Sequence, residues 1–258
     1  MMRPGTISRP HNRFWFSGAA NPDFVIIVKT DNSGDTNDDQ FRLPLRTGFT
    51  YDFTIDFGDG NSQAVTSNSN ITHTYASAGT YTITISKNTQ DIPVFPAIGF
   101  GYDTGGNDSE KLLSVENWGA TQWKSFRFAF MNCGNFDINA SDVPDLSTLS
   151  DTDFRSAFLF CSSLTGGKFG LWDWSAVTSI QNTWDGCGLL NDDFSSVDFG
   201  EILLANEAFD GCNAFTSNLP PMPKCTNFNT MLRNTQFSQP LDEVVTGAPE
   251  NIGFMLDN

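Results

Sequence analysis

Apolar and polar residues alternate along the first part of the chain. Between residues 24 and 86, β-branched and aromatic residues occupy every second position in short runs, most clearly from Tyr51 to Phe57 and from Tyr81 to Ile85. A period of two is typical of strands that bury one face. The runs are separated by glycine, asparagine and aspartate, which suit tight turns. The pattern predicts six strands: Phe24–Lys29, Phe41–Leu45, Thr50–Phe57, Ser62–Thr66, Ile71–Tyr75 and Thr80–Ser86.

Three motifs lie within this alternating segment. Residues 56–60 read Asp-Phe-Gly-Asp-Gly, residues 72–75 read Thr-His-Thr-Tyr, and residues 78–84 read Ala-Gly-Thr-Tyr-Thr-Ile-Thr. Together they resemble a PKD domain. The resemblance implies an immunoglobulin-like β-sandwich that serves extracellular proteins as a spacer or interaction module, without catalysis. It also implies that His73, at the His-x-Tyr position of the family, packs or hydrogen-bonds inside the sandwich.

Beyond residue 101 one short unit recurs. An aromatic residue precedes a cysteine by three positions at Cys133, Cys161, Cys187 and Cys212, and two further copies, near Thr235 and over residues 255–258, lack the cysteine. In most copies other apolar residues lie four and seven positions before the ring, which is helical spacing. Each unit is therefore expected to hold one short helical turn and one extended segment. Because no such unit buries its apolar stripe alone, neighbouring units are expected to stack into a solenoid.

The recurring unit has the form Ala-Phe-x-x-Cys-x-x-Leu/Phe, and residues 172–180 read Trp-Asp-Trp-Ser-Ala-Val-Thr-Ser-Ile. These segments resemble the BspA-type leucine-rich repeats of bacterial surface proteins and some phage proteins. The resemblance extends over residues 112–258. This chain departs from the family in placing phenylalanine at positions that are often aliphatic there, in losing the cysteine from the last copies, and in showing no polar capping unit after Asn258.

The sequence thus predicts a mixed fold, with an N-terminal Ig-like (PKD) β-sandwich and a C-terminal leucine-rich-repeat solenoid of short strands and helical turns. The expected parts are an N-terminal arm over residues 1–22, the sandwich over 23–88, a linker over 89–111 and the solenoid over 112–258.

Charge narrows the choice of partners. The chain carries 14 basic and 30 acidic residues, a net charge of −16, so attraction to nucleic acid or anionic lipid is not expected. The arm is the exception, because it holds arginines and no acidic residue before Asp23. A docking segment and a disordered terminus with incidental arginines are both open. The docking candidates are Arg3, Arg9, Arg13, Phe14, Trp15 and Phe16; the three rings are expected to pack on the sandwich or on a neighbouring subunit.

Neither a signal peptide nor a membrane span is predicted. The first 22 residues lack an apolar core, and no window reaches the ~18 apolar residues that a spanning helix needs. Either a leader has been removed, or the protein leaves its cell by lysis or as part of a particle.

The acidic loop over residues 31–39 offers oxygen ligands of the kind that Ca²⁺ takes. It fails the EF-hand pattern, since Thr36 stands where that pattern has glycine and Arg42 where it has glutamate. A solvated hairpin loop is favoured and calcium binding stays open. Asp56 and Asp59 are expected to accept backbone hydrogen bonds in their tight turn, with metal binding there as a minor alternative. No metal site is predicted elsewhere.

The cysteines and histidines indicate no catalysis. Four of the five cysteines share one repeat position, which favours buried free thiols over disulfides. The two histidines, His11 and His73, are not placed to activate a nucleophile. There is no P-loop and no dinucleotide-binding motif. We therefore expect no enzyme activity, no catalytic residues and no cofactor.

The leading functional hypothesis is a phage virion surface protein, a capsid decoration or a fibre- or tail-associated component. Its arm would dock on a capsid or tail protein of the same virion, as a homo-oligomer in the assembly, and its repeats would display a face for adhesion to a host cell-surface glycan or protein. The first alternative is an extracellular BspA-like adhesin of the bacterial cell surface. The second is a carbohydrate-binding accessory module, with Trp118, Trp172 and Trp174 as candidate surface-binding residues.

Overall fold

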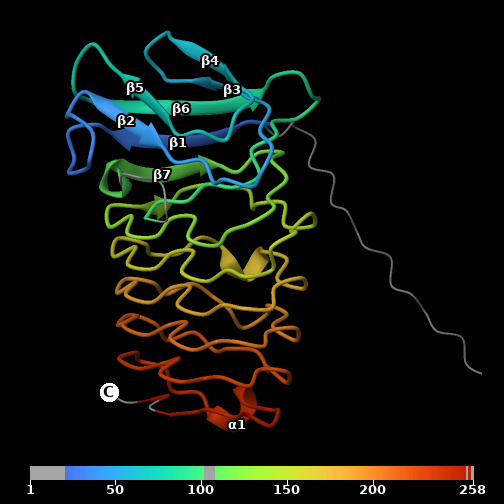
Figure 1. The fold of residues 1–258 in the computed structure, drawn as a ribbon. Helices are drawn as coiled ribbons and strands as arrows, with labels where there is room; N and C mark the ends of the chain where they lie inside the picture. The colour runs from blue at the N-terminus through green and yellow to red at the C-terminus, as the bar shows by residue number, and fades with distance from the viewer. Residues whose placement is uncertain (1–20, 102–107, 254, 257–258) are drawn as a thin grey trace, which may run out of the picture.

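A computed structural model describes residues 21–101, 108–253 and 255–256. It is elongated, with a β-sandwich at one end and a stack of irregular coils that leads away from it (Figure 1). Nearly all regular structure is β-sheet. Among the described residues, helices are limited to two 3₁₀ segments, η1 (Ser109–Lys111) and η2 (Phe169–Leu171), and the single-turn helix α1 (Leu241–Val244). None of them is long and apolar enough to cross a bilayer.

The six predicted strands are all present, with β3 shorter at its start than expected because Asp52 forms only an isolated bridge with Val94. One sheet has the order β4-β3-β6-β1-β7-β8, and a second contains β2 and β5. The strands are β1 (Phe24–Lys29), β2 (Gln40–Leu43), β3 (Phe53–Asp56), β4 (Ser62–Val65), β5 (Ile71–Thr74), β6 (Thr80–Lys87), β7 (Leu112–Asn117) and β8 (Asp137–Ile138).

The larger sheet continues from the sandwich into the coils. Strand β1 pairs antiparallel with β6 on one side and with β7 on the other, and β7 pairs in parallel with β8 of the first coil. The side chains of Phe24, Ile26 and Val28 in β1 are fully buried, because this face of the strand packs into the core and both of its edges are paired, whereas the residues between them are only partly buried. The sandwich and the coils are therefore joined by backbone hydrogen bonds as well as by the chain.

The coils stack in register. Single parallel bridges link successive coils in one line, Asp153 to Ser179, Ser179 to Leu204, Leu204 to Asn227, and Asn227 to Asn251. Rings from neighbouring coils lie face to face. Phe126 stacks on Phe154 at 4.9 Å, Phe130 on Phe158 at 5.4 Å, and Trp184 on Phe209 at 4.9 Å between centroids. The excess of phenylalanine in the composition fills this narrow core.

The predicted helical turn in each unit is wrong. Each unit instead makes two consecutive β-turns, such as 126–129 and 130–133, closed by the amides of Ala129 and Cys133 on the carbonyls of Phe126 and Phe130. The third residue of each turn has a positive φ, which a type II turn requires and a helix excludes. These tandem turns, here named the turn ladder, cover residues 126–133, 154–161, 180–187, 205–212 and 228–235. The left-handed positions are 128 and 132, 156 and 160, 182 and 186, 207 and 211, and 230 and 234.

Two tandem turns place inward-facing apolar residues at the same sequence spacing as a helix does. The apolar pattern alone therefore led to the wrong prediction of a helical turn. The amides of the tandem turns, however, bond to the next coil. The N–H groups of Phe154, Ser156 and Phe158 donate to the carbonyls of Ser179, Gln181 and Thr183 at 2.9–3.0 Å. The tandem turns of every coil repeat this direction, so the inter-coil amides of the turn ladder point away from the sandwich and its carbonyls point toward the sandwich. The first coil consequently presents a row of carbonyl oxygens to the sandwich.

Candidate interaction site at the junction and the turn ladder

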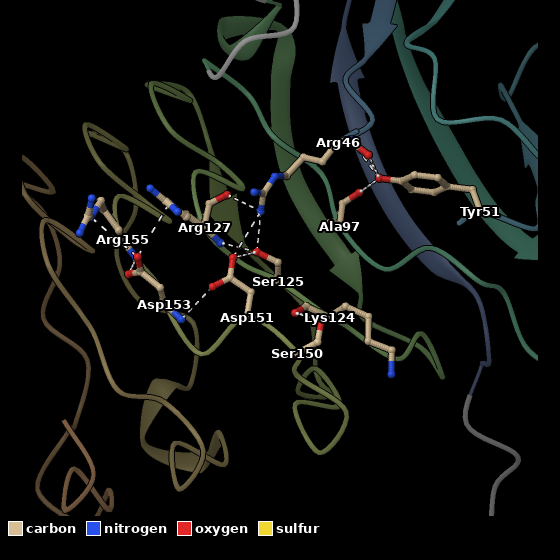
Figure 2. A network of polar contacts seen from close by, with 10 residues as sticks. All are labelled: Arg46, Tyr51, Ala97, Lys124, Ser125, Arg127, Ser150, Asp151, Asp153 and Arg155. Carbon is tan, nitrogen blue, oxygen red and sulfur yellow. Dashed lines mark hydrogen bonds and ion pairs between the residues drawn. The ribbon is translucent and has the colours of Figure 1, made fainter. Parts of the chain in front are cut away.

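Arg46 of the sandwich meets the carbonyl row of the first coil (Figure 2). Its Nη1 atom donates to the carbonyl oxygen of Arg127 at 3.2 Å and to Ser125 Oγ at 2.5 Å, and it lies 3.9 Å from Asp151 Oδ2. Nearby, the amide of Phe100 donates to the carbonyl of Ala129 at 3.2 Å. The sandwich therefore supplies the donors that the preceding coil supplies elsewhere in the stack.

Tyr51 fixes the backbone from which Arg46 extends. The Tyr51 hydroxyl accepts from the Arg46 amide at 2.9 Å and lies 3.0 Å from the carbonyl oxygens of Arg46 and Ala97. Burial raises the pKa of Tyr51 to about 12, so the hydroxyl keeps its proton at neutral pH. The Tyr51 hydroxyl therefore holds the backbone at Arg46, whose side chain makes the contacts with the first coil.

Two arginines lie on the outer side of the first two coils. The Nε atoms of Arg127 and Arg155 both lie 3.8 Å from Asp153 Oδ2, beyond hydrogen-bonding distance, and their side chains are about one-third exposed. The Arg127 guanidinium also lies 5.1 Å from the centroid of the Phe128 ring. One carboxylate thus neutralises only one of two adjacent positive charges, on a chain whose net charge is −16.

The next two coils carry acidic side chains on the same side. Asp185 and Glu207 both accept hydrogen bonds from the Asn182 side chain, at 3.2 and 2.6 Å. Asp210 is paired with Arg233 of the following coil through Nε at 3.0 Å. Burial raises the pKa of Asp185 to about 6, and the neighbouring Asp210 and Glu207 carboxylates add to the rise.

The acidic loop over residues 31–39 encloses an internal cation. Lys111 is fully buried, and its Nζ atom donates to the carbonyls of Thr36, Asn37 and Gln40 at 3.1, 2.8 and 3.0 Å and to Thr36 Oγ1 at 2.9 Å. The Asp108 carboxylate accepts from the amides of Asp35, Thr36 and Arg42. Within the described ranges, no three metal-binding side chains of His, Cys, Asp or Glu converge.

The sandwich motifs meet at His73. Its Nε2 lies 2.8 Å from Asp59 Oδ2, and its ring stacks on Phe57 with 3.9 Å between centroids. The hydrogen bond from His73 lowers the pKa of Asp59 to about 2. Tyr75, packed edge-on against His73, stacks in turn on Tyr81. The Asp-Gly turn, the His-x-Tyr strand and the Gly-x-Tyr strand thus form one aromatic and polar cluster.

Residues 36–88 match the PKD domain family. The PKD match supports the structural role of His73 and Asp59, and the immunoglobulin-like sandwich agrees with it. Residues 152–258, which include most of the turn ladder, match a family described as Mycoplasma protein of unknown function, DUF285. No curated protein and no solved structure matches the chain.

The tryptophans proposed as surface-binding residues are in the core. Trp118, Trp172 and Trp174 are at most 4% exposed, and the indole N–H groups of Trp172 and Trp174 donate to the carbonyls of Gly167 and Phe169. The expectation that these rings form an exposed platform is therefore wrong, because packing between the coils buries them. The docking candidates Arg3, Arg9, Arg13, Phe14, Trp15 and Phe16 lie outside the described residues.

All five cysteines are buried free thiols. Burial raises the pKa of the thiols in the cysteine column, and that of Cys225 to about 11. Three thiols donate to the carbonyl of the aromatic residue in the preceding coil: Cys161 to Phe130 at 3.0 Å, Cys187 to Phe158 at 3.1 Å and Cys212 to Trp184 at 3.0 Å. The column adds side-chain hydrogen bonds to the backbone ladder.

Sequence reasoning did not single out Arg46, Lys111, Arg127 or Arg155. A signal existed for two of them, because Arg127 and Arg155 occupy the same position in successive units, three residues before the ring. Basic residues are rare in this chain, so two at one repeat position mark one side of the stack. Arg46 and Lys111 become visible only when the chain folds and brings distant segments together.

Proposed function

We propose that this chain is a non-enzymatic surface protein of a phage particle, a capsid decoration or a fibre- or tail-associated component, that displays its coil stack for adhesion to host surfaces. The observation that carries the proposal is one aromatic core that runs from the sandwich into the coils. Ring centroids are 5.9 Å apart between Phe24 and Trp118 and 5.4 Å apart between Trp118 and Trp172. Such a core holds the outer face of the stack at a fixed position relative to the sandwich, as a display element requires.

We further propose that the stack is a leucine-rich-repeat solenoid of BspA type. The line of parallel bridges and the repeated cysteine column support this assignment. The PKD match supports a spacer role for the sandwich, because such domains are extracellular-type modules. A structural role is also supported by His73, which packs on Phe57 and is hydrogen-bonded to Asp59 at the surface of the sandwich.

The arm is proposed to dock on a capsid or tail protein, since it carries basic and aromatic residues on an otherwise acidic chain. The alternative is a BspA-like adhesin of the bacterial cell surface, which the same sandwich and stack would suit. The carbohydrate-binding alternative loses its candidate platforms, because the three tryptophans are buried.

The test is co-sedimentation of the purified full chain with intact phage capsids and tails. Two variants remove the docking features, one lacking residues 1–20 and one with Arg3, Arg9 and Arg13 changed to Gln. A matched control changes Lys29, Lys87 and Lys224 to Gln, which removes the same charge elsewhere. Binding that is lost in both arm variants and kept in the control supports the virion role. Adhesion to bacterial cells or matrix without particle binding would contradict it and favour the adhesin.

A further inference from the structure

A cavity of about 250 Å³ lies where the sandwich meets the first coil. Its lining residues come from three segments, which are residues 49–50 just before β3, residues 92–96 after β6, and residues 122–124 just before the first tandem turns. We name it the junction cavity. Because its wall is assembled from the sandwich, the connecting segment and the first coil, a molecule bound in it would contact all three.

The wall of the junction cavity is mainly apolar. Five of its side chains carry no polar group, those of Phe49, Ile92, Pro93, Val94 and Pro96. The two prolines are buried, whereas Phe49, Ile92 and Val94 are partly exposed, so the cavity opens to solvent and leaves apolar surface uncovered. A concave apolar site with a few polar groups at its edge is typical of small-molecule sites.

Backbone hydrogen bonds hold this wall in place. Val94 and Asp52 exchange two amide–carbonyl bonds of 3.0 Å. The amide of Lys124 donates to the carbonyl of Pro96 at 2.8 Å, and the Lys124 carbonyl accepts from the amide of Asp151 at 2.9 Å. The segments that line the cavity are therefore tied to one another without a ligand, and a ligand need not order them on binding.

The charged group of the junction cavity is the ammonium of Lys124. It makes no hydrogen bond or ion pair with any residue that the structure describes, and Figure 2 shows its side chain directed away from Asp151. The nearby carboxylates have other partners. Asp151 accepts from the Ser125 hydroxyl at 2.8 Å, and Asp145 accepts from the Ser147 hydroxyl at 2.6 Å. An unpaired cation thus lines an apolar cavity in a chain whose net charge is −16.

We propose that the junction cavity binds a small aryl carboxylic acid, whose ring enters the cavity beside Phe49 and whose carboxylate pairs with the Lys124 ammonium. The size fits, because an apolar cavity of about 150 Å³ holds one benzene ring, and about 250 Å³ holds a ring with a short side chain. The sign of the charge fits as well. A second cation, the guanidinium of Arg46, lies 5.6 Å from the centroid of the Phe49 ring. The inference goes beyond the proposed function and does not depend on it, because it rests only on the cavity and its charges.

The test titrates phenylacetate into the full chain and follows the backbone amide signals by NMR. The amides of Phe49, Val94 and Lys124 are expected to shift and to saturate with a dissociation constant of about 1 mM, the range for a ligand of this size. Phenylacetamide has the same shape without the charge, and it is expected to bind at least about threefold more weakly. Phenethylammonium carries the opposite charge and is expected not to bind. Saturating phenylacetate is also expected to raise the thermal midpoint, because it binds only the folded junction.

Two variants separate the charge from the space. Lys124→Gln is expected to remove the preference for phenylacetate over phenylacetamide, and the exposed Lys87→Gln, outside the cavity, is its control. Thr50→Trp places a large side chain at an exposed lining position and is expected to abolish binding. Thr47→Trp, exposed in the same loop but outside the lining, is expected to leave binding unchanged. Both tryptophan variants are expected to keep the thermal midpoint of the unliganded chain.

Three results would overturn the proposal. The first is the absence of any saturable shift at the cavity amides. The second is equal affinity for phenylacetate and phenylacetamide in the wild-type chain, which would show that Lys124 recognises no anion. The third is a shift of the same amides on deletion of residues 1–20 without ligand, which would make the N-terminal arm of the chain the occupant of the cavity.

Discussion

The ammonium nitrogen of Lys111 lies 2.8 Å from the carbonyl oxygen of Asn37, inside the acidic loop that the sequence left open as a calcium site. Four donor–acceptor contacts of 2.8–3.1 Å surround this nitrogen, and the side chain is fully buried. The last residue of the linker thus provides the cation of a loop in the sandwich. The carbonyl oxygens of the loop are therefore bound by a lysine of the same chain.

Replacing Lys111 by Met is expected to lower the free energy of unfolding by about 3 kcal/mol, because several buried carbonyl oxygens lose a charged donor. Guanidinium denaturation measures the change, with the exposed Lys87→Met as control. Adding calcium or a chelator is expected to leave the wild-type midpoint unchanged. A wild-type chain that calcium stabilises would contradict the assignment of Lys111 as the resident cation.

Gly186 and Gly211 form a matched pair of left-handed positions, with φ of 75° and 71°. An added Cβ at Gly186 meets the Phe160 ring at 2.4 Å, whereas at Gly211 its closest contact is 3.5 Å. Both alanine substitutions are expected to destabilise the fold by about 1 kcal/mol or more through backbone strain, and Gly186→Ala by the larger amount. In a Phe160→Gly background the two costs are expected to become equal. Equal costs in the wild-type background would show that the ring yields freely.

Asp185 gives the stack a pH dependence of definite sign. Its pKa rises from 3.8 in the unfolded chain to about 6 in the fold, because burial disfavours the carboxylate. The protonated form is thus favoured on folding, and this contribution to stability is lost as pH rises from about 4 through 6. Asp185→Asn is expected to raise the thermal midpoint at pH 7.5 and to leave it nearly unchanged at pH 4. A variant that is less stable at pH 7.5 would contradict the cause assigned to the shift.

The five thiols are expected to be unreactive in the folded chain. Burial raises their pKa values, so the reactive thiolate is scarce at pH 8, and the solvent does not reach the sulfur atoms. A thiol reagent with a coloured leaving group counts the groups directly. We expect no rapid reaction at pH 8 without denaturant and reaction of all five in guanidinium. Rapid labelling of one or more thiols in the native chain would show that the core opens.

Much of the fold could be read from the sequence because its patterns are local. Alternation from Tyr51 to Phe57 and the motif around His73 indicated the sandwich, and the cysteine column indicated stacking. The helical turn was predicted wrongly because tandem turns and a helix place apolar residues at the same spacing. Glycine or asparagine just before the cysteine, as at Gly186 and Asn132, was the signal that distinguishes them, since both tolerate a positive φ.

The junction could not be read in this way. Arg46 and Arg127 are far apart in sequence, and nothing local to Arg46 indicates that it faces a row of carbonyl oxygens. The carbonyl oxygens of the first coil lack donors because the hydrogen bonds of the turn ladder all run from one coil to the next. That direction becomes visible only when the coils are stacked. The tryptophans were ambiguous for a related reason, because a large ring suits either a binding platform or a core, and stacking between coils decided for the core.

The sandwich and the coil stack form one body, in which Arg46 and the amide of Phe100 complete the hydrogen bonds of the first coil. Differential scanning calorimetry of the full chain tests it most directly. We expect a single transition whose calorimetric and van't Hoff enthalpies agree, and a lower single midpoint in the Arg46→Met variant. Two separate transitions in the wild-type chain, with only the first shifted by Arg46→Met, would contradict the claim.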